Sequence, residues 1–426
     1  MVKVVIIGGG WSGCAAAIAA IKAGGQVTLL ERTDMLLGTG LVGGIMRNNG
    51  RFTAAEEMIA LGGGDLFQIC DRNARHKNVN FPGHNHAILY DIVKTHGDVL
   101  RYLIKLGVEI VFRARVKEVN MESCTILEVK DEAGRVFSGD VFIDATGTAG
   151  PQANCTKYGN GCAMCILRCP SFGGRVSIAS LAGIKELVAK KSNGQIGAMS
   201  GSCKLHKESL SAEIQHQLNE KGVVIIPVPD GRKEDHLNIK ACQQYNLPSY
   251  LDNIVLLDTG HAKLMTPFFS LEGLRQIPGF ENARYEDPYA GGKGNSMRFF
   301  ALPPRDNSLL VDNVDNLFCC GEKVGLLIGH TEAITTGTLA GHNSVRLGLG
   351  LDSLVLPRGL AVGDIIAYVK DAMGTEEGMN RKYTFSGSVY FERMKEHNLY
   401  STNIEEIQAR VENSGLTNVF LRRLIE

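Results

Sequence analysis

Residues 2–13 read VKVVIIGGGWSG, and this stretch decides the fold. Residues 2–7 are apolar and mostly β-branched apart from Lys3, which is the composition of a strand buried on both faces. The glycines that follow fit the pattern G-x-G-x-x-G at Gly8, Gly10 and Gly13. The first two glycines let the backbone turn tightly and approach a pyrophosphate, and the third lets a helix pack closely on the sheet. The stretch therefore predicts a strand, a glycine turn and a helix whose N-terminus faces phosphate.

The segment after the glycines completes a dinucleotide-binding unit. Residues 14–22 are rich in alanine and predict a helix, and residues 26–30 predict a second strand that ends on Glu31. Glu31 follows Gly13 by 18 residues, about where an acid accepts hydrogen bonds from an adenosine ribose. The candidate cofactor-binding residues of this unit are Gly8, Gly10, Ser12, Gly13, Glu31 and Arg32.

Three later segments favour FAD over NAD as the dinucleotide. Residues 38–44 form a second glycine loop, of the kind that lets backbone approach the flavin-side phosphate and ring. Residues 141–147 (VFIDATG) follow a run of predicted strands and look like the strand and turn by which two-dinucleotide-fold flavoproteins return to FAD. Residues 316–341 predict a strand, a glycine turn and a helix whose positive end would stabilise a reduced flavin. With Val116 from the run of predicted strands before residue 141, the candidate cofactor-binding residues of these segments are Gly38, Gly43, Val116, Ala145, Thr146, Gly147, Gly321, Glu322, Gly329, Thr331, Glu332 and Ala333.

Two polar groups near these segments are candidates for the substrate side. His330 stands at the start of the last predicted helix, where a ring-nitrogen donor would reach a substrate or a flavin carbonyl, so it is a candidate catalytic residue. Residues 47–49 (RNN) follow the second glycine loop and are candidates for the substrate face.

The chain resembles the glucose-inhibited-division-protein-A-like group of FAD-dependent oxidoreductases. The resemblance rests on residues 8–13, on residues 277–283 (IPGFENA) and on residues 316–341, which look like that group's closing segment. It implies an FAD-binding fold, use in the cytosol and folate- or NADH-linked modification of uridine in RNA.

The sequence departs from that group in three respects. It has no cysteine in residues 38–44, where the RNA-modifying members often place one, and it shows no long C-terminal helical extension of the sort that grips tRNA. Its formal net charge is +0. We therefore carry over the flavin site and keep an RNA substrate as the alternative.

A cysteine cluster is the most individual feature of the chain. Cys155, Cys162, Cys165 and Cys169 follow the spacing C-x6-C-x2-C-x3-C-P. This spacing is close to the loop that binds iron–sulfur clusters, so these four residues are candidate ligands of a [4Fe-4S] cluster. Three alternatives stay open: a zinc site, a redox pair of Cys162 and Cys165 that exchanges electrons with the flavin, and reduced cysteines that line a turn or contact substrate. Cys162 and Cys165 are candidate catalytic residues on the second alternative.

Composition limits the class of protein. The chain has 426 residues, 44% of them hydrophobic and 21% charged, which is ordinary for a globular protein. It contains no apolar run near the ~20 residues that span a bilayer, so we expect no membrane partner. Eleven cysteines without an export signal indicate a reducing cytoplasm.

The predicted fold class is α/β. It comprises a discontinuous Rossmann-like FAD-binding domain (residues 1–150 and 310–350), an inserted substrate domain (residues 151–309) that opens with the cysteine loop, and a helical C-terminal segment (residues 351–426). Within the insert, residues 184–191 predict a helix, as do residues 209–221.

The sequence predicts an FAD-dependent oxidoreductase that transfers two electrons at the flavin, with the cysteine loop as relay or substrate partner. The partner is a small-molecule substrate or a redox protein, NAD(P)H is a candidate reductant, and we expect a homo-oligomer. Two alternatives remain. One is flavin-dependent uridine modification of tRNA or rRNA, and the other is an electron-transfer subunit that serves a protein partner.

Overall fold

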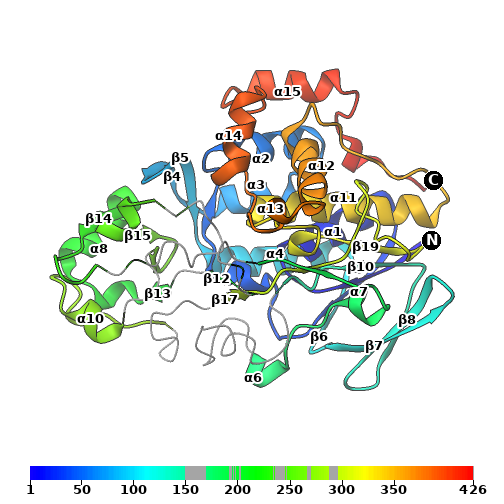
Figure 1. Cartoon of the computed structure of the whole chain (residues 1–426), viewed down its shortest axis with the longest axis horizontal. Helices are drawn as coiled ribbons and strands as arrows, with labels where there is room; N and C mark the ends of the chain where they lie inside the picture. Colours follow the sequence, from blue (N-terminus) through cyan, green and yellow to red (C-terminus); the bar gives the residue numbers. More distant parts are fainter. Residues whose placement is uncertain are drawn as a thin grey trace.

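A computed structural model describes residues 1–148, 169–190, 203–233, 247–265, 270–286 and 296–425, with a few isolated positions between them. A five-stranded parallel sheet lies at its centre (Figure 1). The strand order is β19-β10-β1-β2-β6, and the bounds are β1 Lys3–Ile7, β2 Gln26–Glu31, β6 Glu109–Phe112, β10 Val141–Asp144 and β19 Leu317–Cys319. Strands from both ends of the sequence therefore pair in one sheet, with the N-terminal strand in the middle.

Two helices that pack against the parallel sheet approach each other closely. They are α1 (Trp11–Ala23) and α11 (His330–Gly348). A Cβ atom on Gly337 would lie 2.1 Å from the Ser12 carbonyl oxygen, so only glycine permits this crossing. The same close approach recurs one turn later at Gly341. The contact packs α11 from its third turn, around Gly337, against the first turns of α1.

Antiparallel strands and further helices surround this centre. The three-stranded sheets are β3-β5-β4 (Ile45–Met46, His84–Tyr90, Ala74–Phe81) and β7-β8-β9 (Val116–Glu122, Thr125–Asp131, Val136–Ser138). A four-stranded sheet has the order β13-β16-β15-β14 (Cys203–Leu205, Ala262–Leu264, Asn253–Asp258, Val223–Pro227), and the two-stranded sheets are β11-β18 (Leu187–Val188, Ala301–Leu302) and β12-β17 (Ala198–Ser200, Ser296–Arg298). The other helices are α2 Gly50–Ala60, α3 Asp65–Arg72, α4 Ile92–Leu106, α6 Cys169–Phe172, α7 Ile178–Leu181, α8 Ala212–Lys221, α9 Ser249–Asp252, α10 Leu271–Arg275, α12 Ala361–Met373, α13 Glu376–Met379, α14 Ser388–Glu396 and α15 Ile404–Asn413, and short 3₁₀ turns include η1 Gly38–Val42.

The buried hydrophobic residues form two clusters. One lies within residues 203–285, around the four-stranded sheet and α8. The main cluster surrounds the parallel sheet and also takes in Ile178, Phe300 and Tyr390. It therefore draws on all three predicted segments, while the predicted boundary at residues 150 and 151 lies outside the described residues. The domain division stays a prediction.

The predicted fold class is confirmed: a parallel α/β sheet with a helical C-terminal region. The predicted helix at residues 209–221 is found as α8. The predicted helix at residues 184–191 is wrong, because α7 ends before Gly183 and Leu187–Val188 pairs with Ala301–Leu302 as a strand. Across the described ranges no helix has the length and apolar character needed to cross a membrane.

A buried histidine predicts acid sensitivity of the fold. His342 on α11 is fully buried, and neither ring nitrogen has a hydrogen-bond partner within the described ranges. Burial lowers the pKa of His342 to about 4, and the nearby Arg346 and Arg422 act in the same direction. Since the unfolded chain takes up this proton near pH 6.5 and the folded chain does not, stability is lost as pH falls from about 6.5 to about 4.

We expect wild-type protein to lose about 2 kcal/mol of unfolding free energy from this group between pH 8 and pH 5. His342→Leu should remove that part of the pH dependence in urea unfolding. The matched control is His216→Leu, because the His216 side chain is 70% exposed. Equal slopes for wild type and His342→Leu would contradict the prediction.

Candidate functional site

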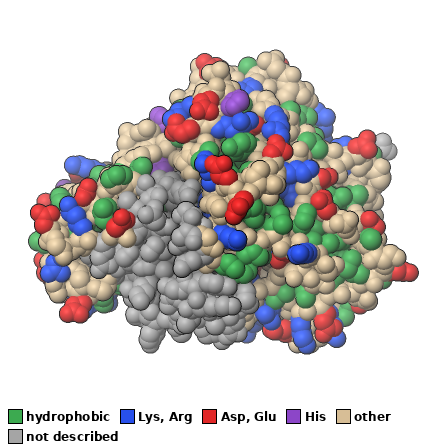
Figure 2. Space-filling model, in the orientation of Figure 1, with side chains coloured by type: hydrophobic (Ala, Val, Ile, Leu, Met, Phe, Trp, Pro, Cys, Tyr) green, Lys and Arg blue, Asp and Glu red, His purple; other side chains and the backbone are tan. Residues whose placement is uncertain are grey.

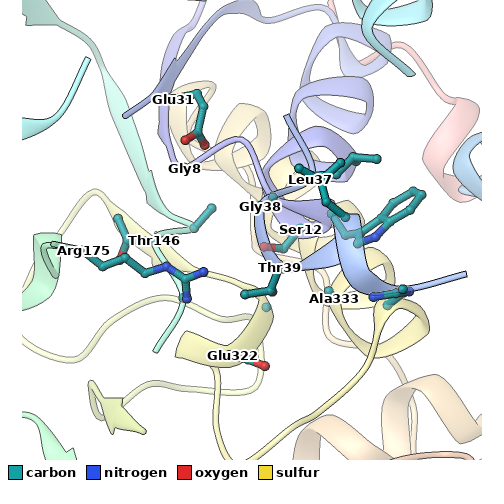
Figure 3. A pocket seen from close by; sticks show the side chains of 18 of the residues that line it. Gly8, Ser12, Glu31, Leu37, Gly38, Thr39, Thr146, Arg175, Glu322 and Ala333 are labelled. Carbon is teal, nitrogen blue, oxygen red and sulfur yellow. The ribbon is translucent and has the colours of Figure 1, made fainter. Parts of the chain in front are cut away.

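A cavity of about 210 Å³ lies where four strands of the parallel sheet end (Figure 3). Residues at or directly after the carboxyl ends of β1, β2, β10 and β19 line it, and among them are Gly8, Glu31, Ala145 and Gly321. In open α/β sheets, ligands bind at this edge. The predicted cofactor-binding residues in its wall are Gly8, Gly10, Ser12, Glu31, Arg32, Gly38, Gly43, Val116, Ala145, Thr146, Gly147, Gly321, Glu322, Gly329 and Ala333.

The glycines before α1 have different surroundings. A Cβ atom on Gly13 would lie 1.8 Å from the Gly8 carbonyl oxygen, so Gly13 serves close packing and does not line the cavity. A Cβ atom on Gly10 would meet nothing within 4 Å. Gly10 is the N-cap of α1, so this open space adjoins the N–H groups of the helix's first turn.

Glu31 is the last residue of β2, and neighbouring residues hydrogen-bond to both of its carboxylate oxygens. One carboxylate oxygen accepts a hydrogen bond from the Gly9 N–H at 2.8 Å, and the other accepts from the N–H and hydroxyl of Thr33 at 2.8 and 2.9 Å. A carboxylate has about four lone-pair positions, so acceptor capacity remains for a ribose. The predicted ribose contact stays a prediction.

The turn after β10 joins the turn after β19. Thr146 bonds back to Asp144 through its hydroxyl at 2.6 Å, and the Thr148 hydroxyl donates to a Glu322 carboxylate oxygen at 2.6 Å. The second Asp144 oxygen accepts from the first N–H groups of α7. These bonds fix the turn at residues 145–147 against the segment that carries Arg175.

Arg175 is a cavity residue that the sequence did not reveal. Its side chain lies beside Thr146 in the wall of the cavity (Figure 3). Burial and, after it, the nearby Arg32 charge lower the pKa of Arg175 to about 10, although Glu322 and Cys169 act in the opposite direction. The guanidinium therefore remains positive at neutral pH and favours an anionic ligand.

Some residues at the N-terminus of α11 line the cavity, and others are buried behind its wall. Gly329, His330 and Ala333 line the cavity. Thr331 and Glu332, also predicted to bind the cofactor, are buried outside its wall. One Glu332 carboxylate oxygen accepts from Arg51 Nε at 3.2 Å and from the Thr384 hydroxyl at 2.7 Å.

Aromatic and basic groups gather near His330. Its ring lies 5.6 Å from the Trp11 ring, and Nδ1 is 3.2 Å from the Tyr90 hydroxyl. The Trp11 indole N–H is buried and has no hydrogen-bond partner within the described residues. Lys263, from β16, donates to the Gly43 carbonyl at 2.5 Å and also lines the cavity.

The predicted substrate-face residues 47–49 do not line the cavity. Arg47 instead forms ion pairs with Glu56 and Asp71. Arg51, the second residue of α2, does line the cavity.

Only the last of the four clustered cysteines lies within the described residues. Cys155, Cys162 and Cys165 lie outside the described residues, and Cys169 is buried at the start of α6. Among the described residues, no three histidine, cysteine, aspartate or glutamate side chains come together as metal ligands. The cluster, zinc and thiol alternatives therefore stay predictions.

Comparison with known proteins places the chain among relatives. It is 30% identical over 112 residues to the methylenetetrahydrofolate–tRNA-(uracil-5-)-methyltransferase TrmFO of Caldicellulosiruptor bescii, a match that covers 26% of this chain and 24% of that protein. Aquifex aeolicus GidA in its form II crystal superposes with a TM-score of 0.70 at 15% identity, covering 99% of this chain and 74% of that one. The form I crystal gives a TM-score of 0.64 at 16% identity, covering 97% and 78%. At such identities the two structures show a shared fold.

The family itself is shown by a family model. The model described as glucose inhibited division protein A matches residues 3–252 and 262–352, which is most of the sequence. The resemblance predicted from the motifs is thereby confirmed. The chain belongs to the glucose inhibited division protein A family.

Proposed function

We propose that the cavity binds FAD. The observation that carries this proposal is the convergence of four strand ends and two helix N-termini on one cavity. The residues fit such a ligand in three ways: open space over Gly10, an unpartnered indole N–H on Trp11 within the described chain, and the Arg175 guanidinium in the wall. When bound, FAD supplies two-electron chemistry.

The chain's own residues would divide the work of holding the cofactor. The N–H groups at the start of α1 would face the pyrophosphate, as helix N-termini do. Glu31 would accept from a ribose hydroxyl, and Arg175 would neutralise phosphate charge. The first turn of α11 would face the flavin, with His330 at its edge.

Arg175→Met tests the charge in the wall. We expect FAD affinity to fall about 10-fold, because a charged hydrogen bond contributes about 1.5–3 kcal/mol and solvent recovers part of it. Arg175→Lys should restore part of the loss. Fluorescence titration of flavin-free protein measures the affinity, with the exposed Arg101→Met as control. An unchanged affinity in Arg175→Met would remove Arg175 from the cofactor site.

We propose further that the flavin serves uridine modification in tRNA. The support is the partial match to a tRNA uracil methyltransferase, together with membership of the family. That match spans about a quarter of the relative, so substrate and reaction come from it as proposals. On the face shown in Figure 2, acidic and basic side chains are interspersed, so RNA binding needs a direct test.

Two measurements test the RNA proposal. Nucleoside mass spectrometry should show one uridine derivative missing from tRNA of cells that lack the gene and restored by its return. Purified protein should bind unmodified tRNA with an affinity that falls steeply as salt rises from 50 to 200 mM, roughly 10³-fold or more for six or more phosphate contacts. Identical tRNA nucleosides with and without the gene would reject the proposal.

One observation favours a second candidate, a thiol- or cluster-linked oxidoreductase. Cys169 is buried at the start of α6, and the Gly173 carbonyl directly after that helix accepts a hydrogen bond from Arg32 in the cavity wall, so this cysteine lies close to the wall. Assays of iron and acid-labile sulfide in anaerobically purified protein, together with its flavin absorbance spectrum, show whether the cysteines bind an iron–sulfur cluster. Iron at the level of one cluster per flavin would favour an electron-transfer role.

A further inference from the structure

The position of the His330 ring is set from several sides. His330 is the first residue of α11, and the Trp11 ring lies 5.6 Å away at an interplanar angle of 34°. A Cβ atom on Gly43 would lie 2.0 Å from His330 Cε1, so the loop after η1 approaches the ring as closely as glycine allows. The ring nitrogen Nδ1 is 3.2 Å from the hydroxyl oxygen of Tyr90, the last residue of β5. The ring itself lines the cavity.

The buried Tyr90 hydroxyl carries a proton that needs an acceptor. Burial raises the pKa of Tyr90 well above its usual range, and the nearby Cys70 thiol adds to the effect, so the phenol keeps its proton. Tyr90 is fully buried, and His330 Nδ1 is the hydrogen-bond partner of its hydroxyl within the described part of the chain. If Nδ1 carried a proton, the phenol proton would be buried without an acceptor, which is strongly unfavourable.

We infer that Tyr90 donates to Nδ1 and holds His330 as the neutral Nε2–H tautomer, so that the ring acts in the cavity as a hydrogen-bond donor and not as a base. In a neutral imidazole one nitrogen donates and the other accepts. With the acceptor engaged by Tyr90, a ligand meets the ring through the Nε2–H. Tyr90 is then a positioning residue for His330.

The acceptor for such a donor is a carbonyl oxygen. The inference rests on the proposed function for its ligand, because both the flavin and a uracil base carry ring carbonyl oxygens. A neutral donor polarises a carbonyl without transferring its proton beforehand. Among the described residues, the charged groups near this end of the cavity are Arg51, Glu332 and Lys263, and the Arg51–Glu332 ion pair places opposite charges side by side.

Nitrogen-15 NMR of histidine-labelled protein reads the tautomer without any assay of activity. The full chain is compared at pH 8.5 without flavin, and His330→Gln identifies the resonances of His330. We expect at least about a 10-fold excess of the Nε2–H tautomer in wild type. In Tyr90→Phe that preference should shrink by about 10-fold. Tyr383→Phe is the matched control, because its buried hydroxyl likewise makes one hydrogen bond within the described residues, to the Gly378 carbonyl at 3.2 Å.

The wild-type spectrum alone tests the tautomer of His330, even if Tyr90→Phe does not fold. A dominant Nδ1–H tautomer, or a charged ring, would overturn the inference. To find which ligand carries the carbonyl that accepts from Nε2–H, FAD is added first and an unmodified tRNA transcript second. A shift of the Nε2–H resonance with FAD assigns it to the flavin, and a shift only with tRNA assigns it to the substrate. No shift in either step would overturn the donor role, whereas failure of FAD to bind rejects the proposed function and leaves the tautomer standing.

Discussion

Replacing Gly10 with valine should strongly weaken FAD binding while leaving the fold intact. Gly10 has φ −69° and ψ −176°, an extended conformation that any residue adopts, and a Cβ atom there meets no atom within 4 Å. A branched side chain would instead fill the space over the first turn of α1, where the proposed pyrophosphate lies. We expect the FAD dissociation constant to rise at least 100-fold, which corresponds to about 2.7 kcal/mol.

The experiment compares Gly10→Val with Gly359→Val. Gly359 also has open space around its Cβ position, but it does not line the cavity. Circular dichroism and thermal unfolding of flavin-free protein should be unchanged in both variants, while fluorescence titration separates them. Normal flavin binding by folded Gly10→Val would show that the cofactor does not use this helix N-terminus. The proposed FAD site would then be rejected.

The parallel core of the fold is predictable because its signals are local. The run of apolar residues before Gly8, the alanine-rich helix and the strand that ends at Glu31 lie within about thirty residues. The later segments at residues 141–147 and 316–341 carry the same short pattern of strand and glycine. Parallel strands buried on both faces read as continuous apolar runs, so the pattern survives without knowledge of the partners.

The side chains that complete the site leave no such local signal. Arg51, Arg175 and Lys263 come from a helix, a loop and a strand more than eighty residues apart, and their common position follows from tertiary packing. The mistaken helix at residues 184–191 has the same origin. Its apolar spacing suits a helix, but Leu187–Val188 pairs with Ala301–Leu302, over a hundred residues later. Pairing across such distances overrides local propensity.

Glu332 shows why a motif residue near a site need not touch the ligand. The sequence made it a candidate for cofactor binding, and the structure buries its carboxylate against Arg51, with 1% of the Glu332 side chain exposed. Arg51 also donates to the Ile328 carbonyl and the Thr384 hydroxyl, each at 3.1 Å. The pair thereby joins α2, the turn before α11 and the segment around Thr384.

Arg51→Met should therefore destabilise the flavin-free protein by about 3–5 kcal/mol, because it leaves the Glu332 carboxylate buried without its cation. The double variant Arg51→Met/Glu332→Met should be more stable than Arg51→Met alone, since both charges are then gone. Urea unfolding at pH 7.5 gives the free energies. The control is Arg358→Met, whose exposed pair with Asp371 should contribute less than about 1 kcal/mol.

The comparison of the single and double variants decides what the pair does. If the double variant recovers stability, the cost in Arg51→Met came from the unpaired carboxylate, and the pair stabilises the start of α11 by mutual neutralisation. If both variants lose stability equally, the hydrogen bonds of Arg51 to Ile328 and Thr384 carry the effect. A loss in Arg51→Met no larger than in Arg358→Met would show that water reaches Glu332. In that case the carboxylate would again be available to a ligand, as the sequence pattern predicted.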